Sequence, residues 1–333
     1  MKQQPKISVI VPVYNAGKHF EDCLTSLAKQ TLKEIEILLV LDCPTDGSDI
    51  VAKNLATKDE RFKLIYNETN LHTGLSRNKG MQQAAGEYIA FCDHDDYTDP
   101  VMYEKLYQTA KHHDCDIVRC NAMSTVNGCN TEHKYPALNA GENIPKQLFH
   151  SIITKKMSGS IWNYIFKTKF VQENRILFPD TRAVAPEDSA FLLQAFFYAK
   201  QIEIIPDILY YSVNHKDSLC NNIEYLSTKN IVAYCGFVNQ FLQKNNIVLD
   251  EKTKQARSFE DAYALYSAFS RSLRLLLLKR TYSELQLVKS NEAIMKHINS
   301  VSYRNILSNI KELKVFVFLL ILKLVPRKKI SST

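Results

Sequence analysis

Apolar residues in the first third of the chain fall into two alternating patterns. Short, nearly continuous apolar runs predict strands at residues 6–13, 36–41, 62–66, 87–92 and 116–119, of which the first two are expected to be buried on both faces. Between these runs, apolar side chains recur at helical spacing over residues 19–29, 48–55, 76–85 and 101–112. Strands that alternate with helices of this length indicate an α/β fold with a mostly parallel central sheet.

The rest of the chain changes character twice. Residues 121–143 are polar and are expected to form an irregular flap or connection, whereas shorter strand and helix signals return over residues 160–213. From about residue 223 the pattern is helical, and five apolar residues have the spacing of one buried face: Ala262, Leu265, Phe269, Leu273 and Leu276. We therefore expect an α/β domain at residues 1–220 and a helical C-terminal region at residues 221–333.

Composition narrows the class of protein. The 333 residues are 45% apolar, which is enough to bury the core of one domain with an appendage. Eight cysteines never form a CxxC pair, and several lie in apolar runs, so we expect buried thiols in a reducing cytoplasm rather than disulfides or a zinc site. The first residues lead into a predicted strand without an apolar signal region, so export is not expected.

Positive charge is concentrated at the C-terminus. Residues 301–333 hold seven basic residues and one acid, so six of the seven net positive charges lie there. A nucleic-acid-binding protein would usually spread basic residues over a folded face, so we expect no nucleic acid partner.

The same tail has an apolar segment. Residues 313–325 are apolar apart from two lysines, and Arg327, Lys328 and Lys329 follow. Thirteen residues are too few to span a bilayer, which needs about 20. An apolar helix beside a basic cluster favours insertion into the anionic cytoplasmic leaflet of a membrane. The alternative is a helix that docks on the protein's own core or on a second subunit.

An acidic cluster, Asp93-His94-Asp95-Asp96, directly follows a predicted buried strand. Carboxylates crowded at a strand end repel one another unless a cation joins them. Alternating oxygen ligands suit Mn²⁺ or Mg²⁺, which commonly bridges substrate phosphates. The alternative interpretation is a solvated acidic loop, with Asp99 capping the next helix.

Further short motifs accompany this cluster in a fixed order. They are Val11-Pro12-Val13-Tyr14-Asn15, residues 26–31, Asp46-Gly47-Ser48, residues 70–78 and residues 86–91, which run into Asp93-His94-Asp95. In order and spacing, these motifs resemble the family 2 glycosyltransferases of the GT-A fold over about residues 5–215. The resemblance implies an inverting hexosyltransferase that takes a sugar from a nucleotide diphosphate, expected to be a UDP-sugar. It also implies a saccharide or lipid-linked saccharide acceptor, used in cell-surface polysaccharide or lipopolysaccharide synthesis on the cytoplasmic face of the membrane.

The resemblance places the donor nucleoside near the end of the first strand. The backbone expected to pass close to it is that of Pro12, Val13 and Tyr14, and Asp42 aligns with the acid that contacts uracil in the family. Around Asp42 the sequence departs from the family, because Leu41 replaces an acid and Cys43-Pro44 replaces Gly-Ser. The alternative for Asp42 is a turn aspartate that hydrogen-bonds nearby backbone.

The same resemblance implies the metal and phosphate contacts. Asp93 and Asp95 are the expected ligands of Mn²⁺ or Mg²⁺, and Asp93 and His94 also belong to the donor-binding segment, although His94 is expected to face outward and not to bind the metal. Arg77 could offer a fork of donors to phosphate or to a site carboxylate, or it could be a surface helix residue paired with an acid. His215 could be a third metal ligand, could contact phosphate, or could do neither.

Glu187-Asp188 opens a predicted amphipathic helix and resembles the family's Glu-Asp element. Inverting transfer is a single displacement, so a carboxylate must take the proton of the attacking acceptor hydroxyl. Asp188 matches the family's base, with Glu187 beside it to orient acceptor or base. The alternative is simple capping of a helix N-terminus. Trp162, the only tryptophan, could stack on an acceptor sugar or could belong to the core.

Other functions fit the sequence less well. A Rossmann dehydrogenase would need GxGxxG after the first strand, which residues 13–17 do not supply. A sugar nucleotidyltransferase would need a glycine-rich basic loop at the same place. A non-catalytic glycan-binding or scaffold protein that retains the GT-A fold is the remaining alternative, and the altered loop at residues 41–44 is its main support.

Overall fold

The structure is a computed structural model that describes residues 4–126, 129–133, 143–157, 159–214, 227–274, 278–301 and 309–326. The chain divides into two compact units. The N-terminal unit lies within residues 1–149, 157–181 and 187–216, and the C-terminal unit lies within residues 150–156, 182–186 and 217–333. The domain boundary predicted after residue 220 lies outside the described residues.

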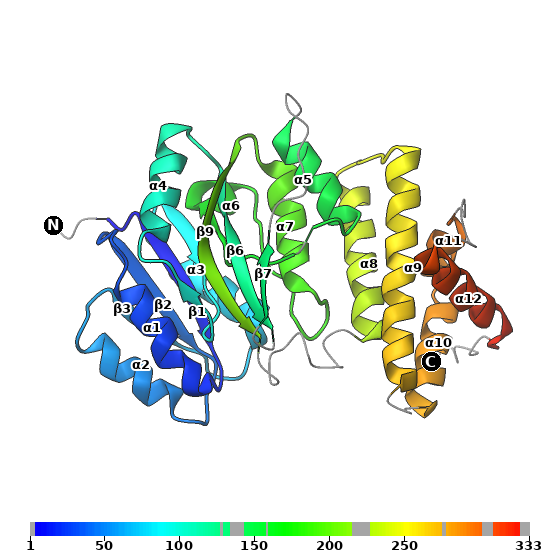
Figure 1. The fold of residues 1–333 in the computed structure, drawn as a ribbon, viewed down its shortest axis with the longest axis horizontal. Coiled ribbons are helices and arrows are strands. Elements are labelled where there is room, and N and C mark those ends of the chain that lie inside the picture. The colour runs from blue at the N-terminus through cyan, green and yellow to red at the C-terminus, as the bar shows by residue number, and fades with distance from the viewer. Residues whose placement is uncertain are drawn as a thin grey trace. The chain divides into compact units, whose positions relative to one another are not determined.

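A nine-stranded mixed sheet forms the centre of the N-terminal unit (Figure 1). Its strands are β1 (Ile7–Val13), β2 (Ile35–Leu41), β3 (Phe62–Tyr66), β4 (Tyr88–Phe91), β5 (Tyr97–Thr98), β6 (Ile117–Val126), β7 (Cys129–His133), β8 (Tyr164–Lys167) and β9 (Ile202–Asn214). Their order is β3-β2-β1-β4-β8-β6-β9-β5, and β7 pairs with β6. The first four strands are parallel, whereas β8 is antiparallel to both neighbours. The predicted α/β class is confirmed.

The carboxyl ends of β1, β2 and β4 meet at one edge of this sheet. Val13 pairs with Leu41 at the ends of β1 and β2, and Ile10 pairs with Phe91 at the end of β4. Every residue of β1 and β2 is buried, as expected for strands covered on both faces. The segments that follow these three strands therefore begin side by side, which is the usual place for a ligand site in a parallel sheet.

The helices of the first half match the helical spacing of apolar residues. They are α1 (Phe20–Ala28), α2 (Ser48–Ala56), α3 (His72–Gln83) and α4 (Met102–His112), and a short 3₁₀ turn at Gly17–His19 precedes α1. The helix predicted at residues 76–85 begins earlier, at His72, because its first turn is polar and shows no apolar spacing. Later helices are α5 (Ile144–Ile153), α6 (Thr168–Glu173) and α7 (Glu187–Tyr198).

The irregular connection predicted at residues 121–143 is wrong over its first part. Residues 121–126 continue β6, and residues 129–133 form β7, which pairs antiparallel with it. Polar residues are frequent here because one face of these strands is solvated: Ala122 is buried, whereas Met123 is partly exposed. Residues 134–142 lie outside the described residues.

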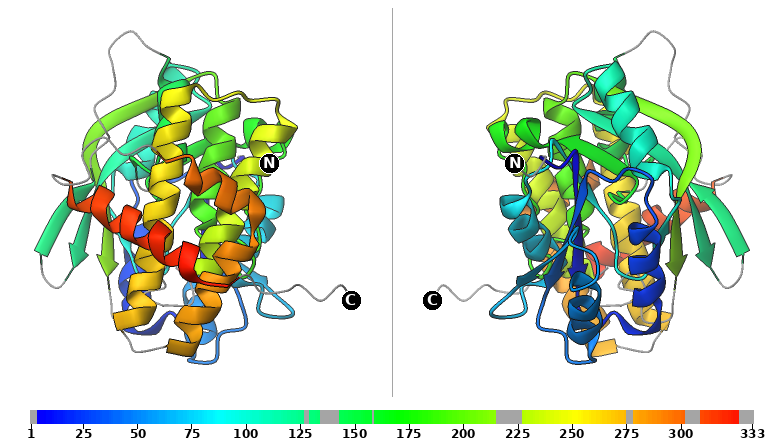
Figure 2. Two further views of the ribbon diagram at one scale, coloured as in Figure 1. Left: turned by 90° about the vertical axis from the view of Figure 1, so that its right-hand side faces the viewer. Right: turned by 90° about the vertical axis from the view of Figure 1, so that its left-hand side faces the viewer.

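The C-terminal unit is helical, as predicted. Its helices α8 (Thr228–Lys244), α10 (Leu278–Ser290), α11 (Glu292–Asn299) and α12 (Ile310–Leu324) all contact the long helix α9 (Glu251–Arg274), which α12 crosses (Figure 2). Ala262, Leu265 and Phe269 are buried in this core. Leu273, predicted on the same face, is 44% exposed because it lies one turn beyond the buried part of α9, and Leu276 lies outside the described residues.

Candidate active site

Two glycines hold α3 close to its neighbours. A Cβ on Gly80 would lie 2.5 Å from the Ile10 side chain, and a Cβ on Gly74 would lie 2.4 Å from the Pro179 carbonyl oxygen. A side chain at either position would force the packing apart, since real Cβ atoms do not approach so closely. This close approach brings Arg77, in the middle of α3, to the carboxyl end of β4.

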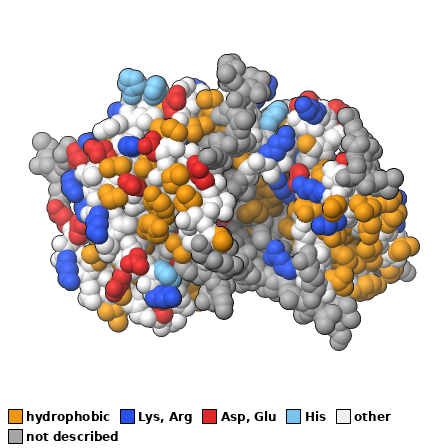
Figure 3. Space-filling model, viewed as in Figure 1, with side chains coloured by type: hydrophobic (Ala, Val, Ile, Leu, Met, Phe, Trp, Pro, Cys, Tyr) orange, Lys and Arg blue, Asp and Glu red, His pale blue; other side chains and the backbone are white. Residues whose placement is uncertain are grey.

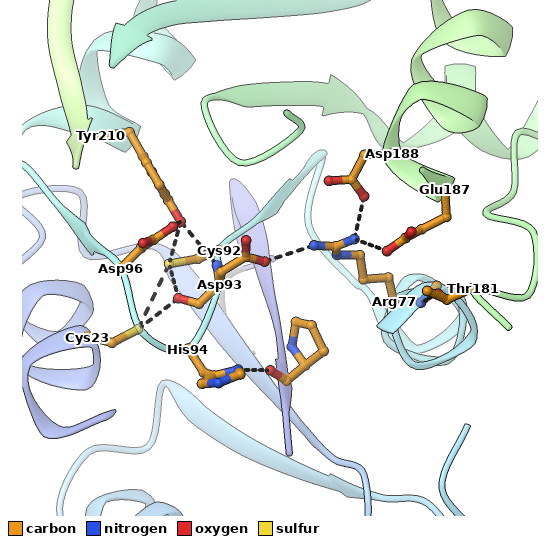
Figure 4. Close-up of polar contacts among 12 residues, drawn as sticks. Cys23, Arg77, Cys92, Asp93, His94, Asp96, Thr181, Glu187, Asp188 and Tyr210 are labelled. Atoms are coloured by element: carbon orange, nitrogen blue, oxygen red, sulfur yellow. Dashed lines mark hydrogen bonds and ion pairs between the residues drawn. The ribbon is translucent and has the colours of Figure 1, made fainter. Parts of the chain in front are cut away.

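Arg77 joins the acidic cluster to the N-terminus of α7 (Figure 4). Its Nη1 donates to Asp188 Oδ1 at 2.5 Å, and its Nη2 donates to Asp93 Oδ1 at 2.8 Å. Glu187 Oε1 lies 3.6 Å from Nη1. The Arg77 side chain is only 2% exposed, so solvent screens its charge weakly. Arg77 is therefore not a surface residue, and it pairs with the carboxylates of Asp93 and Asp188.

The buried charges shift one another's pKa values. Burial alone would lower the pKa of Arg77, but Asp188, Asp93 and Glu187 outweigh it and raise that pKa, so the guanidinium stays charged. Burial raises the pKa of Asp188 to about 8, helped by Glu187 and Asp93 and opposed by Arg77. A carboxylate with a raised pKa binds a proton more readily than an ordinary aspartate, which is what a general base must do.

The acidic cluster could hold a divalent cation with help from a phosphate ligand. Asp93, Glu187 and Asp188 all approach the guanidinium of Arg77, so acidic groups outnumber this cation, and a divalent cation would offset their charge. Within the described residues, no group of three or more His, Cys, Asp or Glu side chains is arranged to hold a metal ion. Mn²⁺ or Mg²⁺ commonly needs only one or two carboxylates, with waters and phosphates as its other ligands. The donor set therefore fits such an ion. His215 lies outside the described residues.

His94 does not face outward as predicted. Its Nδ1 lies 3.1 Å from the carbonyl oxygen of Pro12 at the end of β1, so this nitrogen carries the proton that is donated. Pro12 and Val13 are buried in β1, whereas Tyr14 is 48% exposed just beyond it. The predicted donor-binding backbone and His94 are therefore brought together by the structure.

Asp42 is buried and ties β2 to the start of α3. Its carboxylate accepts hydrogen bonds from Asn67 Nδ2 at 2.6 Å, from Leu71 N at 2.7 Å and from His72 N at 2.9 Å. Asp42 therefore hydrogen-bonds backbone groups, as the alternative interpretation from the sequence predicted. Asn67 was not singled out in the sequence, and the asparagine that follows a strand is a weak signal on its own.

Trp162 belongs to the core. It is 7% exposed, and its ring stacks on Tyr210 with centroids 4.3 Å apart and planes 12° apart. One face of the indole is therefore occupied by Tyr210. The alternative of a core tryptophan describes it better than an open sugar platform.

Two further residues of the site escaped the sequence analysis as individual groups. Tyr210 Oη donates to Asp96 Oδ2 at 2.8 Å and accepts from Asp93 N at 3.1 Å. Asp96 Oδ1 also accepts from Val213 N at 2.8 Å. Burial raises the pKa of Asp96, and Asp93 and Asp95 add to that rise. Asp96 and Tyr210 together fasten the acidic loop to β9, and a tyrosine in an apolar run carries no sequence signal for this contact.

Comparisons with known proteins agree with this geometry. The family model described as Glycosyl transferase family 2 matches residues 8–173. The chain is 30% identical over 259 residues to the putative glycosyltransferase EpsH of Bacillus subtilis. This match covers 77% of this chain and 74% of EpsH. It is 31% identical over 226 residues to TarS of Staphylococcus aureus, a poly(ribitol-phosphate) beta-N-acetylglucosaminyltransferase; that match covers 67% of this chain and 38% of TarS.

Solved structures show the same fold. Residues 1–349 of S. aureus TarS in complex with UDP-GlcNAc superpose with a TM-score of 0.69 at 22% identity, covering 96% of this chain and 90% of that chain. The mannosyltransferase PcManGT of Pyrobaculum calidifontis, in complex with GDP-Man and Mn²⁺, gives a TM-score of 0.52 at 16% identity. This match covers 96% of this chain and 88% of PcManGT. The predicted GT-A fold with a helical C-terminal region is confirmed.

Proposed function

The chain belongs to glycosyl transferase family 2 and is a nucleotide-sugar glycosyltransferase, and from this premise we propose that it moves one sugar, with inversion, from a UDP-sugar to a saccharide acceptor of a cell-surface glycan. TarS, a relative in sequence and fold, has been captured with UDP-GlcNAc, which supports a UDP donor. The observation that carries the proposal is the contact of Arg77 with both Asp93 and Asp188. It brings the expected donor side and the expected base within reach of one guanidinium.

Asp188 is the proposed base. The acceptor hydroxyl attacks the anomeric carbon while the bond from that carbon to the diphosphate breaks, and Asp188 takes the hydroxyl proton. Glu187 lies beside the same guanidinium and is the proposed partner that orients Asp188 or the acceptor. Arg77 holds Asp188 in one place, because its Nη1 bond leaves the carboxylate little freedom to rotate.

Asp93 and Asp95 are the proposed ligands of Mn²⁺ or Mg²⁺, with His215 as a further candidate. When bound, such an ion would neutralise the charge that grows on the leaving diphosphate. Asp93 is also held by Arg77, and Asp96 and Tyr210 fix the loop that carries it. The proposed donor contacts at Pro12, Val13, Tyr14, Asp42 and His94 lie at the same sheet edge.

Donor hydrolysis tests this proposal without knowledge of the acceptor. A panel of UDP- and GDP-sugars is incubated with the full chain and Mn²⁺, and release of the nucleoside diphosphate is measured. We expect hydrolysis of at least one UDP-sugar, its loss with EDTA, and its loss in Asp95→Ala. The exposed Asp22→Ala, on α1, is the matched control and keeps wild-type hydrolysis. No hydrolysis of any donor, or full hydrolysis in Asp95→Ala, would refute the assignment.

We also propose that residues 1–220 carry the transfer chemistry and that the helical residues 221–333 attach the enzyme to the cytoplasmic face of a membrane. No helix in the described part of the chain is both long enough and apolar enough to cross a bilayer. One face of α12 packs in its own unit through Val315, Phe318 and Leu322. A helix docked on its own core, one of the alternatives from the sequence, therefore accounts for this face.

The opposite face of α12 is apolar and exposed. Its residues lie three or four positions apart along the helix, as members of one stripe do: Leu313, Val317, Leu320 and Leu324. Hydrophobic side chains gather over the C-terminal helices in Figure 3. The basic residues 327–329 follow in the sequence and lie outside the described residues. An exposed apolar stripe followed by basic residues supports binding to an anionic leaflet.

Vesicle flotation tests the attachment. The full chain is expected to float with vesicles of phosphatidylglycerol and phosphatidylethanolamine and to stay behind with pure phosphatidylcholine. Replacing Val317 and Leu320 together by serine should weaken binding about tenfold, because two partly buried apolar side chains are worth roughly 1–2 kcal/mol at a membrane. Val248→Ser, at an exposed apolar residue outside α12, is the control. Equal flotation of the wild type and the double variant would show that the apolar stripe of α12 does not bind the membrane.

A further inference from the structure

Four neighbouring strands align a row of side chains on one face of the sheet. Tyr97 of β5 pairs with Tyr211 of β9, Tyr211 pairs with Met123 of β6, and Met123 pairs with Glu132 of β7. Paired residues on adjacent strands point to the same face, so these four side chains form one continuous row. The next row on the same face, two residues along each strand, holds Val213, Thr125 and Asn130.

This face points to solvent. The adjacent row, which consists of Thr98, Tyr210 and Ala122, points the other way and is buried. Tyr97 is 41% exposed, and Tyr211 and Met123 are partly exposed. Hydrophobic side chains gather in Figure 3 over the part of the sheet where Figure 1 labels β9. The sheet therefore presents an apolar, aromatic area that its own core does not use.

The two tyrosines form an ordered platform. Their rings are parallel within 6°, with centroids 4.8 Å apart, so Tyr211 fixes the orientation of Tyr97. β5 is the last strand in the order of the sheet within the described residues, so Tyr97 lies at the edge of the sheet. A ring whose orientation is already fixed loses little side-chain entropy when a ligand stacks on it.

The chemistry of the face favours a neutral sugar chain. A pyranose ring has an apolar C–H face that stacks on an aromatic ring, and hydroxyl groups that bond polar side chains. The two rows supply tyrosines at one side and Thr125, Asn130 and Glu132 at the other. They contain no lysine or arginine, and Glu132 is an acid, so a polyanion or an anionic lipid would find no charge partner there.

The platform lies one residue along the chain from the candidate active site, on the opposite face of β5 and β9. Tyr97 directly follows Asp96, and Tyr211 directly follows Tyr210, whose hydroxyl contacts both Asp96 and the backbone of Asp93. We propose that the outer face of β5, β9 and β6 binds the sugar chain of the acceptor beyond the residue that reacts, with Tyr97 and Tyr211 as its stacking platform. This inference rests on the proposed function, since the bound chain is that of the acceptor.

Affinity electrophoresis tests the platform directly. The full chain runs through native gels that contain dextran, galactan or a glucomannan, and its mobility is compared with that in a gel without polysaccharide. We expect at least one glycan to slow the wild type. Tyr97→Ala should raise the dissociation constant about tenfold, as the loss of one aromatic stacking contact would. Tyr97→Phe, which keeps the ring, should retain binding.

Tyr66→Ala is the matched control, because Tyr66 is an exposed tyrosine on β3 at the other edge of the sheet. Circular dichroism checks that each variant is folded. The proposed platform would be wrong if no glycan slows the wild type, or if a glycan slows Tyr97→Ala as much as the wild type. Donor hydrolysis by the wild type distinguishes the two failures: if the enzyme hydrolyses a UDP-sugar but binds no glycan, the platform is wrong and the proposed function stands.

Discussion

Arg77 and Asp188 are 111 residues apart in the chain, yet Nη1 of Arg77 lies 2.5 Å from Oδ1 of Asp188 in the interior of the N-terminal unit. A second nitrogen of the same guanidinium holds Asp93. The fork of an arginine can bond two carboxylates in fixed directions, which a lysine cannot do. This pairing relates the proposed base to the proposed donor side, and the first predictions follow from it.

Replacing Arg77 with lysine should lower kcat/KM for donor hydrolysis and transfer at least 100-fold. The charge remains, but one ammonium cannot hold Asp93 and Asp188 in both fixed directions, and a small misplacement of a base is costly. Arg61→Lys is the control, because Arg61 also forks onto a carboxylate, that of Asp59, at a site away from α3. If both variants retain full activity, Arg77 does not position the base.

Asp188→Asn should reduce kcat for transfer by roughly 10²- to 10⁴-fold, the usual worth of a general base, while the nucleotide still binds. UDP affinity is measured by calorimetry in parallel with the rate. Glu187→Gln should have a smaller effect, since Glu187 lies farther from the same nitrogen, at 3.6 Å. A larger loss in Glu187→Gln than in Asp188→Asn would exchange the roles of the two acids.

The pH dependence of kcat/KM follows from the raised pKa of Asp188, about 8. A general base works only when it is deprotonated, so kcat/KM should rise with pH and level off above about 8. Below that value it should fall nearly tenfold for each unit, because the fraction of ionised Asp188 falls in that proportion. The residual activity of Asp188→Asn should lack this slope. A flat profile between pH 6 and 9 in the wild type would contradict the assignment.

Gly74→Ala should destabilise the N-terminal unit by about 1–3 kcal/mol and lower activity, because the new Cβ would meet the Pro179 carbonyl at 2.4 Å and push α3 away. Urea denaturation of the full chain measures the change. Gly236→Ala is the control: this glycine lies in α8 with nothing within 4 Å of the added carbon, and alanine should stabilise a helix there by up to ~1 kcal/mol. Equal stability of the two variants would show that the close packing of Gly74 against the Pro179 carbonyl is not required for stability.

Asp261→Asn should destabilise the C-terminal unit by roughly 3–5 kcal/mol, since it would leave buried cations without their partner. Asp261 is 3% exposed and lies 2.6 Å from Lys155 and 2.8 Å from His297 Nε2. Burial would raise the pKa of Asp261, but Lys155, His297 and Arg257 lower it. Its contribution is therefore present above the ordinary aspartate pKa and fades as pH falls towards the lowered one.

Thermal unfolding of the full chain at pH 7 measures this loss. Glu260→Gln, the partly exposed neighbour that pairs with Lys311, is the control and should cost no more than about 1 kcal/mol. A similar melting temperature for Asp261→Asn and the wild type would show that the buried network adds no net stability.

Local sequence was sufficient for the elements whose residues all share one environment. The strands predicted at residues 6–13 and 36–41 were placed almost to the residue, because a buried parallel strand is a continuous apolar run. The end of β6 and all of β7 were missed, because strands with a solvated face carry many polar residues, and their sequence then resembles that of a loop. In α12 apolar residues occur on both faces, so the pattern did not tell which face packs on the protein.

The order of motifs, read by family resemblance, singled out Asp93, Arg77 and Asp188 from the sequence alone. Only the tertiary structure decided that Arg77 faces both acids, that Trp162 stacks on Tyr210, and that Tyr210 secures Asp96. These contacts join segments from different strands and helices, and their geometry depends on how the sheet brings those segments together. A side chain's local sequence records its burial and its helical or strand spacing, whereas its distant partner is set by the packing of the whole unit.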